Sequence, residues 1–396
     1  MTLLPLEPNP GGQLDPSEII GRDELVADLW HVLRKQGVIL TAERRIGKTH
    51  VIKKMMAEPP PGIQFVYSDL EQAHTAEEFA DLVYRSVRDR IGLAEKLREG
   101  SKRVLKHVGE ANVKGIGISL EVKSTPWKDL LFRIATEIEK DKDNLFIFFW
   151  DELPLMIKDI ADNEGDRQAM EVLDSLRALR QTYPRIRMVY TGSVGLHHIL
   201  TRLRRAGYTN RPTNDMFAVE VIPLESSDAQ ILARRLLLGG KIATDHPHPV
   251  ASAIAKAVDG IPFYIHHVVA AMRNLNKVEV STVDEVLTKV LMAPEDPLDL
   301  HHFELRVGTY YEEGDRPAIL ALLDSTAVSA KPLTLEEVFN LLKARVVTDD
   351  LEYVRELLLL LRQDHYLQQN PDGTYEFRFG IIRRWWRTHR GLEALQ

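Results

Sequence analysis

The chain has 396 residues, of which 44% are hydrophobic and 28% are charged. That length suits two or three domains, and that balance is typical of a folded globular protein rather than a disordered one. The formal net charge of -7 argues against a surface built throughout for nucleic acid, although one basic patch is compatible with it. The chain contains no cysteine, which excludes disulfides, cysteine-based zinc sites and thiol nucleophiles.

The chain start lacks the basic region and apolar core of a signal peptide. The longest purely apolar runs, residues 145–150 and 357–361, are much shorter than the ~20 residues that span a bilayer. We therefore expect a soluble, cytoplasmic protein that does not enter the membrane.

Residues 1–18 are rich in Pro and Gly and predict an extended arm, and residues 19–224 predict alternating helices and strands. The predicted strands are 38–40, 64–68, 145–150, 186–190 and 217–222. Helices are predicted at 21–33, 47–56, 127–140 and 166–182, and a short one is predicted before the fifth strand. A further helix follows the second strand, and Thr75 and Glu78 can form the capping box at its start. This alternation indicates βαβ crossovers and a mostly parallel α/β sheet. Residues 92–124 are predicted to be an insertion with a basic helix and a strand or hairpin.

Beyond Pro223 the pattern predicts helices alone, which defines a helical lid over residues 225–300. Residues 301–396 predict three helices and then a hairpin over residues 366–379, turning at Asn370-Pro-Asp-Gly. That order of elements is typical of a winged-helix domain.

The strongest motif is Val38-Ile-Leu-Thr-Ala-Glu-Arg-Arg-Ile-Gly-Lys-Thr49, a strand that leads into a turn and a helix. In a phosphate-binding loop (P-loop), backbone N–H groups and the positive helix end surround the phosphates. Lys48 would reach the β- and γ-phosphates, Thr49 would ligate Mg²⁺, and Gly47 would allow close approach. Ala42 replaces the first glycine of the usual pattern, so a surface turn that caps a helix remains the alternative. The residues predicted to bind nucleotide here are Ala42, Arg44, Arg45, Ile46, Gly47, Lys48, Thr49 and His50.

A pair of acids follows the apolar strand at residues 145–150. Ligands of open α/β sheets bind at the carboxyl ends of the strands, where Asp151 would hold Mg²⁺ and Glu152 would act as the general base on the attacking water. The alternative is a strand that ends in solvated carboxylates. Together with the loop, the acids predict an ATPase with ATP and Mg²⁺ as cofactors.

Four segments together resemble a known group: Ile20-Gly-Arg-Asp-Glu-Leu, Ala42-Glu-Arg-Arg-Ile-Gly-Lys-Thr, Trp150-Asp-Glu and Tyr190-Thr-Gly-Ser. They are similar to the bacterial and archaeal AAA-type P-loop ATPases (ASCE class) that are related to the STAND and Orc/Cdc6-like ATPases. The resemblance covers about residues 18–275 and, more loosely, the winged helix. It implies that Gly21 and Arg22 lie near the adenine, and that Thr191 or Ser193 is the sensor 1 residue, although a hydroxyl at a strand end is often only a local hydrogen-bonder.

The same resemblance implies an arginine finger between the fourth and fifth strands. Arg204, Arg205 and Arg211 are the candidates, and Arg205 is the one we assign to catalysis. A finger supplied by a neighbour would make the protein a homo-oligomer; an ordinary solvated face is the alternative. Arg44 or Arg45 would neutralise phosphate charge or face a neighbouring subunit, with solvated loop arginines as the alternative.

In the lid, Asp259-Gly-Ile-Pro-Phe263 resembles the GxP motif of STAND and Orc-like ATPases, which implies that Pro262 packs by the adenine. Pro262 stands where a sensor 2 arginine is typical, so that role is unassigned, and a switch between ADP and ATP states is favoured over a fast motor. A plain helix start at Gly-Pro is the alternative.

Two functions remain open. In the first, the winged helix docks on the ATPase as a nucleotide-controlled switch that a protein partner regulates. In the second, the winged helix binds DNA. The cations and aromatics of residues 383–390 favour DNA, whereas the acidic, leucine-rich helix at residues 349–362 does not. Trp385 and Trp386 would equally cap a core.

The paired histidines at 197–198, 266–267 and 301–302 are not expected to bind metal, because neighbours on a helix do not share a face.

Overall fold

The computed structural model describes residues 3–91, 126–192, 195–345 and 348–392, and it divides into two compact units. We call Asp23–Thr41 with Val51–Glu220 the sheet unit, and Met1–Arg22, Ala42–His50 and Val221–Gln396 the helical unit. The predicted insertion at residues 92–124 and the sensor candidate Ser193 lie outside the described residues.

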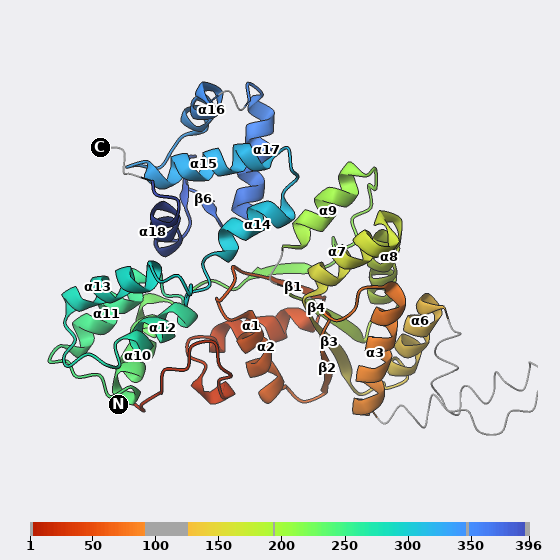
Figure 1. Cartoon of the computed structure of the whole chain (residues 1–396). Helices are drawn as coiled ribbons and strands as arrows, with labels where there is room; N and C mark the ends of the chain where they lie inside the picture. Colours follow the sequence, from red (N-terminus) through yellow and green to blue (C-terminus); the bar gives the residue numbers. More distant parts are fainter. Residues whose placement is uncertain (1–2, 92–125, 193–194, 346–347, 393–396) are drawn as a thin grey trace, which may run out of the picture. The chain divides into compact units, whose positions relative to one another are not determined.

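The sheet unit contains a five-stranded parallel sheet in the order β2-β3-β4-β1-β5, which confirms the predicted α/β class (Figure 1). The strands are β1 (Val38–Thr41), β2 (Ile63–Asp69), β3 (Leu145–Asp151), β4 (Ile186–Tyr190) and β5 (Phe217–Glu220). In β4, Tyr190 pairs with Ile39 of β1 on one side and with Trp150 of β3 on the other. The carboxyl ends of β1, β3 and β4 therefore lie along one edge of the sheet.

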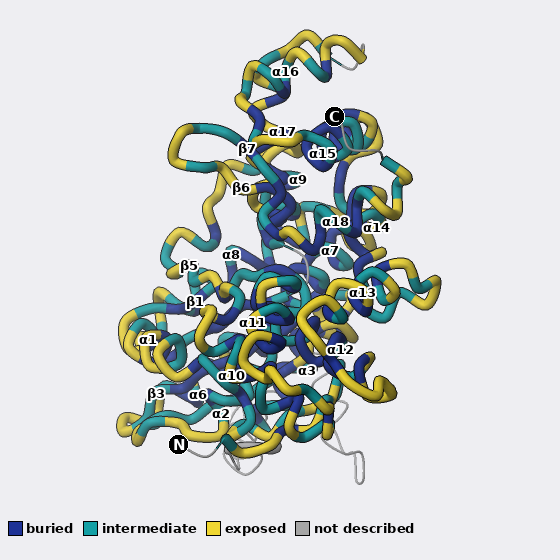
Figure 2. Tube along the Cα trace, turned by 90° about the vertical axis from the view of Figure 1, so that its left-hand side faces the viewer, coloured by how far each residue is buried: buried dark blue, intermediate teal, exposed yellow. Residues whose placement is uncertain are grey.

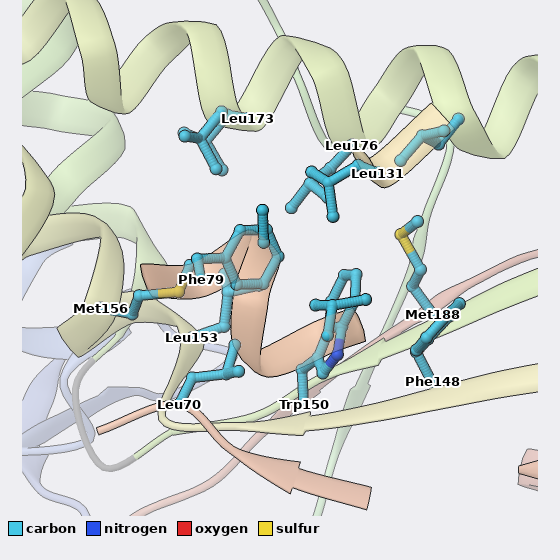
Figure 3. Packing of buried hydrophobic residues seen from close by; sticks show 14 of the residues in the cluster. Leu70, Phe79, Leu131, Phe148, Trp150, Leu153, Met156, Leu173, Leu176 and Met188 are labelled. Atoms are coloured by element: carbon cyan, nitrogen blue, oxygen red, sulfur yellow. The ribbon is translucent and has the colours of Figure 1, made fainter. Parts of the chain in front are cut away.

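One face of the sheet carries a hydrophobic core. Alternate residues of β3 point into it, and Trp150 packs edge-on against Phe79, with ring centroids 5.3 Å apart. Leu153, Met156, Leu173 and Leu176 close around these rings (Figure 3). The intervening β3 residue Phe149 faces the other way and meets Trp30 of α1 (Asp23–Leu33) at 6.4 Å. Because helices cover both faces, β3 is apolar from residue 145 to residue 150, up to its terminal Asp151.

The remaining helices of this part of the chain are α2 (Lys48–Ala57), α3 (Ala76–Ile91), α6 (Trp127–Ile138), α7 (Leu153–Glu164), α8 (Asp166–Thr182) and α9 (Leu196–Arg205). The pattern had not predicted α7, which begins directly after the acid pair with a proline in its first turn; proline is compatible with that position. The predicted capping box of α3 forms only in part. Thr75 accepts from the Glu78 amide, but the Glu78 carboxylate accepts from the His74 amide instead of that of Thr75.

The helical unit begins with the predicted extended arm, which ends in a short 3-10 helix, η1 (Pro16–Glu18). The Leu6 amide donates to the Arg235 carbonyl, and the Leu6 side chain is buried. The following helices are α10 (Ser226–Gly239), α11 (Pro247–Ala257), α12 (Pro262–Ala271) and α13 (Val280–Leu291). This run of helices agrees with the change of pattern at Pro223.

The last segment contains α14 (His302–Tyr310), α15 (Arg316–Val328), α16 (Leu335–Ala344), α17 (Leu351–Gln363), β6 (Leu367–Gln369), β7 (Tyr375–Phe377) and α18 (Gly380–His389). Strands β6 and β7 form an antiparallel pair, so a hairpin lies where the sequence predicts one. The assignment of the whole segment as a winged helix stays a prediction.

Buried and exposed residues alternate along the helices of both units, as amphipathic helices on a core require (Figure 2). Within the described ranges, none of the helices has both the length and the apolar character needed to cross a membrane.

Candidate nucleotide-binding site

The loop at residues 42–49 has the backbone of an anion-binding nest. Arg45 has φ 69° and Gly47 has φ 105°, with Ile46 between them at negative φ. Alternation of this kind turns successive N–H groups toward one concave side, where they bind anions. An added side chain at Gly47 would be strained by that φ, which explains the glycine. Helix α2 starts at Lys48, so its positive end also faces the loop.

The Lys48 ammonium lies against the backbone of its own loop. Its Nζ donates to the Ala42 carbonyl at 2.8 Å and to the Glu43 carbonyl at 3.4 Å. Lys48 is buried. The lysine is therefore held inside the turn that the sequence assigns to phosphates.

Arg22 also lies against this loop, within the helical unit, and Gly21 precedes it. The buried Arg22 donates from Nη2 to the Ile46 carbonyl at 3.2 Å, and burial lowers the pKa of its guanidinium despite the nearby Asp228. Gly21 has φ 66°, and an added Cβ would lie 2.5 Å from an Asp228 carboxylate oxygen. The backbone angle and the close approach both require glycine there.

The two loop arginines are fixed by the lid and by the segment before α14. Arg44 and Arg45 each donate from Nε to the same oxygen of Asp299, at 2.9 and 3.0 Å. The Arg45 guanidinium also lies 4.4 Å over the ring of Phe263, next to Pro262 in the first turn of α12. Burial raises the pKa of Asp299, but the two arginines lower it more, so the net shift is downward. The GxP motif thus lies beside the loop.

A buried ion pair joins the loop to α14. The Glu43 carboxylate, 3% exposed, accepts from Arg306 Nη1 at 2.8 Å. Arg306 also donates from Nη2 to Asp364, and its guanidinium lies over the Tyr366 ring at 5.2 Å. Burial raises the pKa of Glu43, but Arg306 and the histidines His302 and His365 outweigh burial and hold it at about 2. Glu43 is therefore an anion at every physiological pH.

On the sheet unit, the acids and the predicted sensor come together. Asp151 is buried, and its two oxygens accept from Thr191 Oγ1 at 3.0 Å and from the Tyr67 hydroxyl at 3.1 Å. The neighbouring Asp151 raises the pKa of Tyr67, after the larger effect of burial. Glu152 has φ 55°, an uncommon backbone for a non-glycine residue that costs on the order of 1–3 kcal/mol and is concentrated at functional sites.

The finger candidates Arg204, Arg205 and Arg211 are all exposed, the first two at the end of α9. Arg204 donates from Nε to the Leu200 carbonyl at 3.2 Å and from Nη2 to the Thr201 hydroxyl at 3.0 Å. His50 lies in the first turn of α2, one residue after Thr49.

The residues present suit magnesium and a triphosphate by their chemistry. Thr49 offers a hydroxyl and Asp151 a carboxylate, the oxygen ligands that Mg²⁺ takes beside phosphates. Chain connectivity places the loop directly after β1, and β4 alone separates β1 from β3 in the sheet. The carboxyl ends of β1 and β3 are thus near neighbours along the sheet edge.

Sequence reasoning missed Glu43 in the loop, the loop's partners Asp299 and Arg306, Asp364 that binds Arg306, and Tyr67 that binds Asp151. Glu43 lies inside the motif and, as a carboxylate in a phosphate-binding loop, was the one available signal. Arg306 is 263 residues away from it, so no local pattern could connect the two.

A parallel sheet with a nest-forming Gly-Lys-Thr loop after β1 and an acid pair after β3 is the fold of the AAA-type P-loop ATPases. The Walker-type ATPase PABY2304 of Pyrococcus abyssi superposes with a TM-score of 0.64 at 17% identity, covering 94% of this chain and 97% of that one. The ORC2 protein of Aeropyrum pernix, in its ADPNP-ADP complexes, gives 0.55 at 11% identity, covering 96% and 97%. No protein-family profile and no curated protein matches the sequence. At these identities the likeness shows the fold alone, which this chain shares with the Pyrococcus abyssi ATPase and the Aeropyrum pernix ORC2 protein.

Proposed function

We propose that the protein is a Mg²⁺-dependent ATPase that acts as a nucleotide-controlled switch in an oligomeric assembly. The observation that carries this proposal is the buried pair of Glu43 and Arg306, which ties the phosphate-binding loop to the C-terminal helices. A loop tied in this way transmits the presence of phosphate to those helices. The solved Pyrococcus abyssi protein, which is named as a Walker-type ATPase, supports the hydrolytic part.

Each residue has a role in the proposed reaction. The loop amides and Lys48 bind the β- and γ-phosphates, and Thr49 and Asp151 hold Mg²⁺, which supplies positive charge to the phosphate oxygens when bound. Glu152 takes the proton of the attacking water, and the Thr191 hydroxyl orients that water or the γ-phosphate. Gly21, Arg22 and Pro262 border the adenine.

The switch follows from the charges around the loop. Asp299 is an anion that pairs with Arg44 and Arg45 of the loop. The Glu43 carboxylate accepts a hydrogen bond from the Arg44 backbone amide. A triphosphate brings further negative charge to the same place and competes with Asp299 for Arg44 and Arg45. ATP then favours the state in which these links are broken, which is the differential affinity that a switch needs.

Two variants test the chemistry. Lys48→Ala should abolish nucleotide binding in calorimetry. Glu152→Gln should retain binding and lose turnover by about 100-fold or more, because removal of a general base costs 10²–10⁴ in rate. Normal hydrolysis by Glu152→Gln would show that the assigned base is wrong, and normal ATP binding by Lys48→Ala would refute the site as a whole.

DNA binding is the second candidate, because a pocket of about 530 Å³ on α18 is lined by Gly380, Arg383, Arg384, Arg387, Thr388 and Leu392. The fold shared with an ORC2 protein also favours it. Against it, Trp385 and Trp386 are buried and cannot stack on bases. ATPase stimulation by DNA that declines steeply with salt would support this candidate, and stimulation by a protein partner alone would favour the switch.

A further inference from the structure

Two histidines and a glutamate from the first and last helices of the C-terminal segment come together on the surface of the helical unit. His301 caps the start of α14, Glu304 lies one turn later, and His389 ends α18. One potential ligand atom from each lies within 4.8 Å of the other two. We propose that these three side chains form a binding site for Zn²⁺ or a similar transition-metal ion.

The three groups are held in place by their neighbours. Arg390 donates from Nη1 to Oε1 of Glu304 at 3.0 Å, which leaves Oε2 beside His389 Nε2 at 2.8 Å. The Trp385 ring stacks on His389 at 4.6 Å and meets His301 edge-on at 6.4 Å. A carboxylate fixed by an arginine and imidazoles fixed by a buried ring are the kind of support that orients metal ligands.

The donor set selects the metal. Two imidazoles and a carboxylate suit Zn²⁺, Co²⁺ or Ni²⁺, whereas Mg²⁺ prefers oxygen ligands alone. Ligands of a tetrahedral zinc ion lie about 3.4 Å apart, given metal–ligand distances of ~2.0–2.1 Å. Since His301 and His389 are exposed, modest rotations can bring the three atoms to that spacing, with water as the fourth ligand. Binding requires the proton on His389 Nε2 to leave that atom, for the other ring nitrogen or for solvent.

The site joins α14 to α18 and differs from the nucleotide site in position and chemistry. On α14, His301 and Glu304 are more exposed, whereas His302 and Arg306 are buried and reach toward Glu43 of the loop. The pairing of adjacent histidines in the sequence did not reveal the site, because its second imidazole comes from another helix. The bound ion would fix α14 against α18.

The test uses the full chain without an affinity tag and without nucleotide. Equilibrium dialysis with Zn²⁺ should give one ion per chain, and Co²⁺ should give visible absorption of a low-symmetry site. His301→Ala and His389→Ala should each weaken binding by at least about 10-fold. His248→Ala, an exposed histidine on α11, is the matched control and should bind as the unchanged chain does.

Zn²⁺ should also raise the melting temperature of the unchanged chain and of His248→Ala, but not that of the two ligand variants. Failure of the unchanged chain to bind one ion overturns the proposal. So does equal binding by His301→Ala and His389→Ala, since the ion would then lie elsewhere. Lys48→Ala should bind Zn²⁺ normally, so this result is independent of the proposed ATPase activity.

Discussion

At the scale of single residues, the most informative feature is the buried charge at Glu43. A carboxylate in a phosphate-binding loop would be costly without a partner, and Arg306 provides one from α14. Arg306 is itself 8% exposed and is also bound to Asp364. Removal of either Glu43 or Arg306 alone would therefore leave a buried charge unpaired and lower the stability of the fold.

We predict that Arg306→Met lowers the free energy of unfolding by about 3–5 kcal/mol, because it leaves buried carboxylates without a cation. Arg355→Met, which removes an exposed arginine on α17, is the control and should change stability by less than about 0.5 kcal/mol. Urea denaturation measures both. The double variant Glu43→Gln with Arg306→Met should be less destabilised than the sum of its single variants, and strict additivity would contradict direct coupling of the pair.

The sequence could predict which polar residues of the sheet unit lie close together, because they stand at the carboxyl ends of neighbouring strands. Thr191 and Asp151 lie at the carboxyl ends of adjacent strands, and the structure joins them by a hydrogen bond. Gly21 and Arg22 came only from the resemblance, and Arg22 does contact the loop, at the Ile46 carbonyl. Two other contacts were not predictable: that of Arg306 with Glu43 and that of Tyr67 with Asp151. Both depend on tertiary packing, for which a single sequence carries no local signal.

At the scale of elements, helix α12 and the N-terminal arm are linked by a buried histidine. The Asn9 amide donates to Nδ1 of His266 at 3.1 Å, so this nitrogen must be unprotonated. Burial, followed by the nearby His50 and His267, lowers the pKa of His266 to about 4. In the unfolded chain the same group has a pKa near 6.5. The unfolded state thus binds the proton first, and stability must fall as pH falls from about 6.5 toward 4.

We predict that this group alone costs about 2 kcal/mol of unfolding free energy between pH 7 and pH 5. His266→Asn keeps an acceptor for the Asn9 amide but does not titrate, so the loss over this range should shrink by about that amount. Urea denaturation at both pH values measures it, and His248→Ala is again a suitable control. An equal pH dependence in His266→Asn would show that His266 is not the group responsible.

Elements with a clear period were predictable, and the strands of the sheet lie within a few residues of their predicted bounds. Helix α7 was not, because an acid pair followed by Leu-Pro has the composition of a loop. Its proline is tolerated since it occupies the first turn, and its N-cap Glu152 adopts a left-handed backbone with no sequence signature. The helix that the sequence failed to predict therefore begins directly after Glu152, the residue with the strained backbone that we assign to catalysis.

At the scale of the whole molecule, the proposed switch requires neighbouring copies of the chain. Arg205, one of the exposed arginines Arg204, Arg205 and Arg211, would then complete the site of an adjacent copy. Size-exclusion chromatography with light scattering should show a larger mass with a slowly hydrolysed ATP analogue than with ADP. Lys48→Ala should remain at the smaller mass under both conditions.

We predict that Arg205→Ala lowers turnover by about 10³-fold while ATP binding is kept, since fingers contribute 10³–10⁵ in rate. Arg204→Ala and Arg211→Ala are matched controls from the same exposed region. If one of these two lowers turnover instead, the finger is reassigned to it. If all three variants hydrolyse ATP normally, the site does not use an arginine from this segment.

The path of the chain through its two units limits how the protein can be dissected. The backbone passes from one unit to the other after Arg22, Thr41, His50 and Glu220, so neither unit is a continuous stretch of sequence. A fragment that stops at residue 220 keeps the P-loop but lacks Phe263, Asp299 and Arg306, which hold that loop. Truncation at this boundary therefore removes the contacts of the loop, and separating the two units would require cutting the chain at all four crossings.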